Sequence, residues 1–228
     1  MREKVLAGLG ALAAVLLVRN LYVMLLQLPD EVDQGAIYRI MFFHIPAFFT
    51  AGMCYIVSMC ASAYGLWKSD LKADALAMSA TEVGLAFAAV NLITGMIWGR
   101  IIWGIWWAWD PRLTWALICW LVYFGYLMLR QAVDDPSERA KITAVVNIFA
   151  FVSVTITWKA ITWWRTQHPG PVLSIRGADG KTDPAVEAMI YMNWIPLLLL
   201  AVILVSIRVR QERALRELDA MRRWAHAA

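Results

Sequence analysis

The sequence predicts an all-α, polytopic membrane protein, built as one bundle of about six transmembrane helices with both termini cytoplasmic. Composition is the first observation, because 61% of the 228 residues are hydrophobic and the mean hydropathy is +0.58. Soluble domains have only about 45–50% apolar residues. The second observation is that six apolar stretches reach the length of about 20 residues with which a helix crosses a hydrocarbon core of about 30 Å. The third is that charged, proline and glycine residues lie between these stretches.

The first three spans are expected over about Val5–Leu28, Ile45–Trp67 and Ala75–Ile102. The first span contains Arg19, a cation that is costly at this depth unless it snorkels or faces a partner inside the bundle. The second span begins beside Pro46, and proline suits the first turn of a helix because the N–H groups of that turn are unpaired in any case.

Two interpretations of the N-terminal residues stay open. Arg2 and Lys4, followed by the apolar run Val5–Val18, resemble a cleaved signal peptide. The polar Arg19 is followed by a second apolar stretch that continues to Leu28. This arrangement fits a retained membrane anchor better than a cleaved leader.

The last three spans are expected over about Pro111–Leu129, Ile142–Trp164 and Ala185–Ile207. The fourth span has a clear start signal, because Asp110 is a favoured N-cap residue and the proline after it is a favoured first helical residue. Residues from about 208 to 228 form a charged tail, which we expect to be a helix at the membrane surface. No stretch is left for a separate water-soluble domain, so the whole chain is expected to be a single membrane-embedded domain.

The distribution of lysine and arginine predicts the orientation, since short cytoplasmic loops carry the excess of these residues. With the N-terminus inside, the cytoplasmic segments hold Arg2, Lys4, Lys68, Lys72, Arg130, Arg139, Lys141, Arg208, Arg210, Arg213, Arg216, Arg222 and Arg223. The opposite side holds Arg39, Arg100, Arg112, Lys159, Arg165, Arg176 and Lys181, and Arg19 completes the 21 cations. This bias places three unusual segments on one outer face: the loop that ends at His44, the tryptophan-rich segment (residues 98–115), and the loop that contains His168.

The two histidines of this face are candidate metal ligands. His44 lies where the second span is expected to begin, and His168 lies where the fifth span ends. A neutral imidazole is a good iron ligand, and haem iron accepts one axial ligand on each face of its ring. Two histidines from separate helices can therefore hold one haem. The alternative is that each histidine is an interfacial polar residue that bonds to the backbone.

The tryptophan-rich segment holds six of the 13 tryptophans of the chain, which suggests a platform for a flat ligand. Tryptophan is also enriched at membrane interfaces for its amphipathic shape, and that alternative stays open for single residues. Haem is an apolar plate with two carboxylates, so its site needs flat apolar contacts next to cations or backbone donors. Asp110 begins a helix whose N-terminal N–H groups suit an anion, and Arg100, Arg112 or Arg165 could hold the propionates. Asp110 itself is expected to cap the helix and order the loop.

These segments resemble the motifs of a known family. The run from Trp103 to Thr114 is similar to the WWD signature of haem-handling proteins in cytochrome c maturation. His44-Ile45-Pro46-Ala47 and the run from Trp163 to His168 resemble the two flanking histidine segments of the haem exporter protein C (CcmC) family. The resemblance covers most of the chain, and the three motifs occur in the family's order.

The resemblance implies a function and a set of partners. It implies non-covalent haem b held at the periplasmic face of the bacterial inner membrane, with iron bound by His44 and His168, and delivery of this haem to the chaperone CcmE. It also implies assembly with the ATPase CcmA and with CcmB and CcmD. Membrane lipid is expected to surround the protein, and nucleic acid is not expected as a partner. The haem contacts carried over by motif or proximity are Trp98, Arg100, Trp103, Trp106, Trp107, Trp109, Asp110, Arg112, Trp163, Trp164 and Arg165. No bond change would be catalysed, so the protein is expected not to be an enzyme.

Two other functions stay open. A b-type cytochrome that moves electrons across the bilayer usually has haems near both faces, whereas the only other histidine is His226 in the tail. A subunit that itself translocates haem as part of an ABC transporter would show polar groups along a midplane route. The candidates for such a route are Asn91, Thr94, Thr155 and Thr157, although hydroxyls are also ordinary in helix packing.

Overall fold

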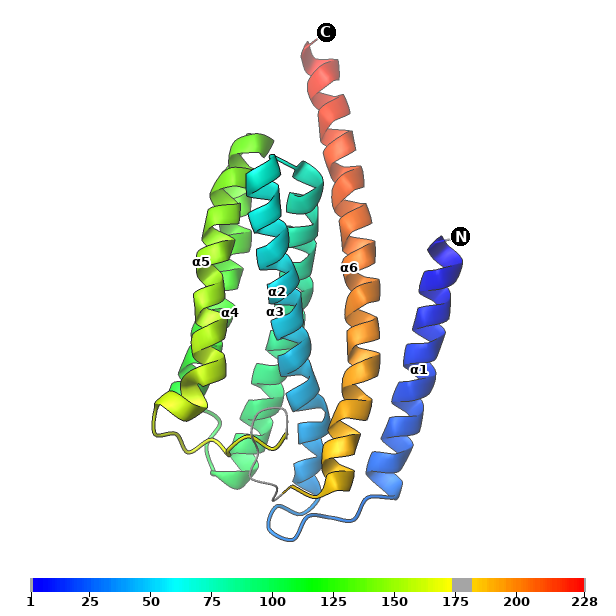
Figure 1. Ribbon diagram of the computed structural model, residues 1–228, viewed down its shortest axis with the longest axis vertical. Coiled ribbons are helices and arrows are strands. Elements are labelled where there is room, and N and C mark those ends of the chain that lie inside the picture. Colours follow the sequence, from blue (N-terminus) through cyan, green and yellow to red (C-terminus); the bar gives the residue numbers. More distant parts are fainter. Residues whose placement is uncertain (1, 174–181, 228) are drawn as a thin grey trace.

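The structure is a computed structural model that describes residues 2–173 and 182–227 (Figure 1). Within these residues it has six long helices and one short 3-10 helix, η1. Their bounds are α1 Arg2–Leu26, η1 Ala36–Ile40, α2 Met41–Lys68, α3 Leu71–Ile102, α4 Pro111–Ala132, α5 Pro136–Trp163 and α6 Pro184–Ala227. All six long helices of this part of the chain are long and apolar enough to cross a membrane. The all-α, six-span prediction is therefore confirmed.

Aspartates begin three of these helices. Asp70, Asp110 and Asp135 each have an extended backbone and accept a hydrogen bond from the N–H two residues later. Each bond satisfies one of the donors that the first turn of a helix leaves unpaired. The predicted start of the fourth span at Asp110 and Pro111 is confirmed.

The start of the second span differs from the prediction. η1 leads directly into α2, so Pro46 lies in the second turn of α2 and not in its first turn. Tyr38 and Phe42 are 3% and 0% exposed and belong to one apolar cluster. Burial of these upstream side chains extends the helix before the proline. It offsets the cost of a proline in the second turn, which is a lost backbone hydrogen bond and crowding of its ring against the preceding turn.

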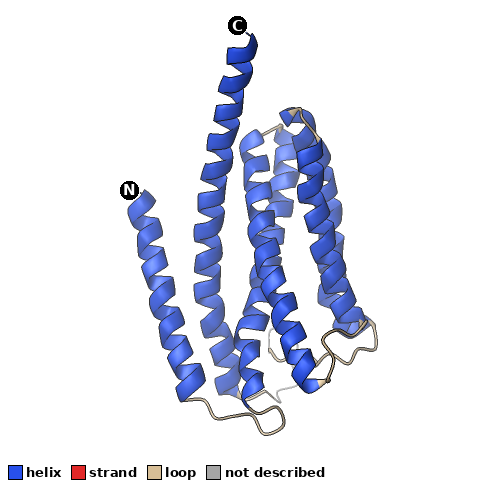
Figure 2. Ribbon diagram, turned by 180° about the vertical axis from the view of Figure 1, so that it is seen from behind, coloured by secondary structure: helices blue, strands red, loops and turns tan. Residues whose placement is uncertain are grey.

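α2 lies at the centre of the arrangement and packs against α3, α5 and α6, while α4 packs against α5 and α3. α1 lies at the edge of the bundle, next to α6 (Figures 1 and 2). Close contact between α2 and α3 depends on Gly84, because a Cβ there would lie 2.9 Å from the Tyr55 ring. Tyr55 in turn stacks on Tyr123 of α4, with ring centroids 3.8 Å apart. Small and flat side chains thus hold these helices together.

The three segments of interest meet at one end of the bundle, as predicted. Residues 27–40, 103–110 and 164–173 all lie at this end, which we call the loop end, and both chain termini point the opposite way (Figure 1). The charged tail is helical, and it continues the axis of α6 beyond the bundle instead of forming a separate segment. At 1.5 Å per residue the 44 residues of α6 extend about 66 Å, well beyond a hydrocarbon core of about 30 Å. Arg176 and Lys181 lie outside the described residues.

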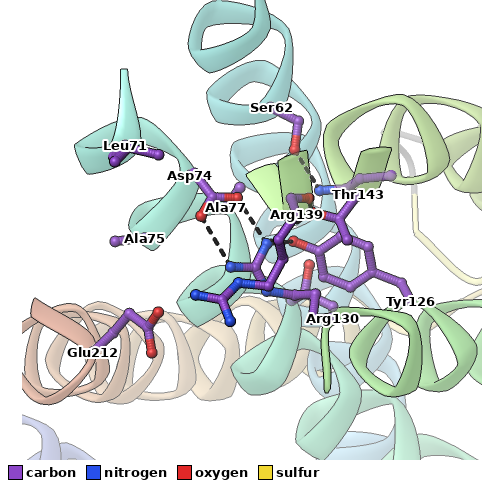
Figure 3. Close-up of polar contacts among 12 residues, drawn as sticks. Ser62, Leu71, Asp74, Ala75, Ala77, Tyr126, Arg130, Arg139, Thr143 and Glu212 are labelled. Atoms are coloured by element: carbon purple, nitrogen blue, oxygen red, sulfur yellow. Dashed lines mark hydrogen bonds and ion pairs between the residues drawn. The ribbon is translucent and has the colours of Figure 1, made fainter. Parts of the chain in front are cut away.

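A buried ion-pair cluster joins the helices at the other end (Figure 3). Asp74 of α3 accepts hydrogen bonds from Arg130 of α4 at 2.7 and 2.9 Å, and from Arg216 of α6 at 2.7 Å. Arg130 also donates to Thr143 of α5 at 2.8 Å. The carboxylate of Asp74 is thereby neutralised and fully bonded, so the cluster fixes four helices together far from the loop end.

Arg19, whose partner the sequence did not identify, contacts α6 and its own neighbour. Its guanidinium donates to Asn20 at 3.0 Å and lies 3.6 Å from the sulfur of Met192. Asn20 is itself buried and donates to the Met192 carbonyl at 2.9 Å. These contacts attach α1 to α6.

Candidate functional site

A cavity opens at the loop end between α2, α3, α4 and the segment that follows α5. Apolar and aromatic side chains such as Phe48 and Leu92 form most of its wall. Six of the residues that the sequence predicted to hold haem line this one cavity: His44, Trp98, Trp103, Trp107, Arg112 and His168. Segments that are far apart in the sequence therefore converge on one concave site.

His44 projects from α2 toward α3. Its Nδ1 atom lies 3.0 Å from Oγ1 of Thr94, and this hydroxyl lies 2.7 Å from the Val90 carbonyl. The side-chain amide of Asn91 donates to the His44 carbonyl at 2.9 Å and lies 3.2 Å from Nε2 of the ring. Gly95 makes room for the ring, because a Cβ there would lie 3.0 Å from Cε1 of His44. The imidazole is thus held between α2 and a small-residue face of α3.

His168 lies in the segment that follows α5. Its backbone N–H donates to Oγ1 of Thr166 at 3.0 Å, and its Nδ1 lies 2.9 Å from the carbonyl oxygen of Pro169. A carbonyl only accepts hydrogen bonds, so Nδ1 carries the proton. In the neutral ring the lone pair is therefore on Nε2.

Asp110 links the tryptophan-rich segment to the segment of His168. One of its oxygens accepts from the Arg112 N–H at 2.8 Å and from the Thr166 hydroxyl at 2.6 Å. The other oxygen accepts from the Gln167 N–H at 2.9 Å. Asp110 is buried and does not line the cavity, in agreement with the expectation that it orders the loop.

Three tryptophans of the segment form one wall of the cavity. Trp98 donates from its indole nitrogen to Gln34 at 2.8 Å and meets Trp103 edge to face, with ring centroids 5.0 Å apart. The indole nitrogen of Trp107 is buried and has no hydrogen-bond partner among the described residues. Because an unpaired buried donor costs roughly 1–3 kcal/mol, this N–H suits an acceptor brought by a ligand.

The other aromatic candidates lie outside the cavity. Trp106 and Trp109 are 57% and 78% exposed at the loop end. Trp163 and Trp164 are also exposed, and Trp164 stacks on Trp115 with ring centroids 6.4 Å apart. Exposure at the rim makes these rings available to lipid or to a partner.

Among the three candidate cations, Arg112 alone lines the cavity. Its side chain is buried, donates to the Thr157 carbonyl, and places its guanidinium carbon 4.3 Å from the centroid of the Phe48 ring. Arg100 donates to the Gly104 carbonyl, and Arg165 is exposed beyond the rim. The structure therefore brings one fixed positive charge to the cavity.

Sequence analysis missed the residues that support the histidines. Asn91 and Thr94 were considered only for a polar route through the membrane, and Thr166, Gly95 and Gln34 were not considered at all. The spacing of Asn91, Thr94 and Gly95 places them on one face of a helix, which was the available signal. Nothing local in the sequence indicated that this face meets His44.

Comparisons with known proteins agree with the motifs. A family model described as CcmC, Heme exporter protein C, matches residues 1–224. Heme exporter protein C of Bradyrhizobium diazoefficiens is 34% identical over 225 residues, which cover 96% of this chain and 85% of that protein. The protein of the same name from Paracoccus denitrificans is 35% identical over 85% of this chain and 80% of its own length. The Escherichia coli K12 protein is 31% identical over 80% and 73%, respectively. The chain belongs to the Heme exporter protein C family.

Proposed function

We propose that this protein binds haem b non-covalently in the loop-end cavity, with iron ligated by His44 and His168, and presents it for transfer to the haem chaperone CcmE during cytochrome c maturation. Membership in a family named for haem export supports the choice of ligand. The observation that carries the ligation is that both histidines line one cavity although they are far apart in the sequence. Haem is cargo in this proposal, so no bond change is catalysed.

The hydrogen bonds of the two rings support iron binding through Nε2. The Thr94 hydroxyl has a backbone carbonyl within reach for its own hydrogen, so it accepts from Nδ1 of His44. The Pro169 carbonyl accepts from Nδ1 of His168. Hydrogen bonds of this kind fix the tautomer and the ring orientation of metal-binding histidines and place the lone pair on Nε2. At His44, iron would take the place of the Asn91 amide, which lies 3.2 Å from Nε2.

The remainder of the cavity suits a porphyrin that carries two carboxylates. Its wall is mainly apolar, as the plate of the ligand requires. The unpaired indole N–H of Trp107 and the guanidinium of Arg112 supply a donor and a positive charge for carboxylate groups. Because haem would be held by coordination and contact only, binding is reversible, which transfer to a chaperone requires.

Orientation and partners complete the proposal. The excess of cations near the chain termini supports cytoplasmic termini and a periplasmic loop end, in the inner membrane of a bacterium. The exposed rings of Trp106 and Trp109 would then face the periplasm, where CcmE could reach them. CcmA, CcmB and CcmD are the proposed partners within the membrane complex.

Measurement of haem on purified protein tests the proposal. The wild type is expected to hold about one haem per chain with a six-coordinate, low-spin absorption spectrum, since each iron takes two axial ligands. His44→Ala and His168→Ala should each lose haem or shift to a five-coordinate spectrum. His226→Ala, on the helix at the opposite end, is the matched control and should match wild type. An unchanged spectrum in either of the first two variants would refute ligation by both histidines.

A second cavity favours one alternative, in which haem itself passes through this subunit. This cavity lies beside the first and shares Phe48, Phe49 and Asn91 with it, and Thr155 and Thr157 also line it. Gly52 lies on its wall, and a Cβ there would meet nothing within 4 Å, so Gly52→Trp is the substitution chosen to narrow this cavity. Passage through the second cavity predicts slower haem loading in membranes. Presentation alone predicts unchanged loading.

A further inference from the structure

We infer that Asp110 is a positioning residue for His168, acting through Thr166 and without contact to haem. The inference rests on the proposed function, because it assumes that His168 binds iron. Asp110 lies at the start of α4, whereas His168 lies in the segment that follows α5. A direct chain of hydrogen bonds connects the two.

The chain of bonds has two steps. Asp110 accepts a hydrogen bond from the Thr166 hydroxyl at 2.6 Å, and the same hydroxyl oxygen accepts from the backbone N–H of His168 at 3.0 Å. A parallel bond runs from the Gln167 N–H to the second oxygen of Asp110 at 2.9 Å. The backbone N–H groups of Gln167 and His168 are thus bonded to one buried carboxylate, the first directly and the second through Thr166.

These bonds exceed what a helix cap requires. Asp70 caps α3 through the same kind of bond, from the Lys72 N–H to one carboxylate oxygen at 2.8 Å. Asp110 makes the equivalent bond to Arg112 and adds two bonds to residues 56 and 57 positions away. Asn caps helices about as well as Asp does, so capping alone does not need the second carboxylate oxygen. The second oxygen of Asp110 is needed for Gln167.

The segment of His168 depends on this anchor because it has no regular secondary structure of its own. Thr166 and His168 lie in the irregular segment between Trp163, where α5 ends, and residue 173. A ligand on a loop holds its geometry only if neighbouring bonds fix the backbone, and productive sites tolerate errors of about 0.5 Å. Asp110 is the N-cap of α4, a long helix. Its hydrogen bonds therefore attach the backbone at His168 to the fixed end of that helix.

The test compares Asp110→Asn with Asp70→Asn in the full-length protein loaded with haem. Asp110→Asn keeps the cap bond but loses the acceptor for Gln167. We expect a mixture of six-coordinate and five-coordinate haem and a haem dissociation rate that rises about 10- to 100-fold, the usual effect of losing a residue that holds a metal ligand in place. Added imidazole should restore the six-coordinate spectrum in Asp110→Asn, as it should in His168→Ala. Asp70→Asn should match wild type.

Variants of Thr166 keep the inference testable if Asp110→Asn does not fold. Thr166→Val removes the hydroxyl and should reproduce the spectral change, whereas Thr166→Ser keeps the hydroxyl and should match wild type. A wild-type spectrum and dissociation rate in Asp110→Asn or in Thr166→Val would overturn the positioning role. If His168→Ala also leaves the spectrum unchanged, the proposed function fails instead. A change in His168→Ala with none in the other variants defeats the positioning inference alone.

Discussion

Oγ1 of Thr94 lies 3.0 Å from Nδ1 of His44, and this contact joins α3 to the candidate iron ligand on α2. The Thr94 hydroxyl has the Val90 carbonyl 2.7 Å away for its own hydrogen, so the imidazole is the donor. The contact therefore selects the tautomer whose Nε2 is basic. The tautomer of His44 that the proposed iron ligation requires is thus supported by a residue 50 positions later.

Replacement of Thr94 tests this dependence. Thr94→Val keeps the shape of the side chain but removes the acceptor, so haem affinity should fall about 10- to 100-fold. Thr94→Ser keeps the hydroxyl and should bind haem as the wild type does. Titration of the purified apoprotein with haem, followed by absorbance, measures the difference. Equal affinities in the two variants would show that the hydroxyl does not act on the ligand.

Gly95 gives a steric test of the same site. A Cβ at this position would lie 3.0 Å from Cε1 of His44, closer than side chains normally approach. Gly95→Ala is expected to displace the imidazole and to weaken or shift the haem spectrum. Gly52→Ala is the matched control on α2, because a Cβ there meets nothing within 4 Å. Wild-type spectra in both variants would mean that the ring adapts freely to the added methyl group.

Substitutions of Trp107 and Trp106 should affect two different steps, haem retention and haem transfer. Trp107 lines the cavity with an unpaired indole N–H, so Trp107→Phe should release haem faster. Trp106 is exposed at the rim, and Trp106→Ala should retain haem but pass it more slowly to CcmE. Stopped-flow transfer from purified protein to apo-CcmE distinguishes the two rates. The double variant should show both defects while still inserting into membranes.

The cluster around Asp74 should affect stability without changing the loop-end site. Asp74→Ala leaves Arg130 buried without its carboxylate, and loss of one partner of a buried ion pair costs about 3–5 kcal/mol. Thermal unfolding in detergent should therefore shift to a clearly lower midpoint. Glu3→Ala removes the exposed Arg210–Glu3 pair and is expected to change little. A haem spectrum that changed in Asp74→Ala before unfolding would contradict the independence of the two ends.

Much of the fold could be predicted from local pattern. Hydropathy located the six spans because the length of an apolar run is itself the requirement for crossing a membrane. Asp110 followed by proline marked the start of α4, since capping depends on neighbouring residues alone. The start of α2 was placed too late because burial of Tyr38 and Phe42 outweighed the signal of Pro46. The unbroken extension of α6 into the tail was likewise not foreseen.

The candidate site divides in the same way. The sequence by itself determined which residue types are available at the loop end: two histidines, a run of tryptophans and several arginines. Because successive spans run in opposite directions, the positions of the spans in the sequence place all of these residues at the same end of the bundle. Only the tertiary structure decided that Trp107 and Arg112 face the cavity while Trp109 and Arg165 do not. It also paired His44 with Thr94, and Asp110 with the segment of His168. The physical reason is that hydropathy and capping act over a few residues. The rotation of each helix about its axis and the path of each loop, by contrast, result from packing between residues that are distant in the chain.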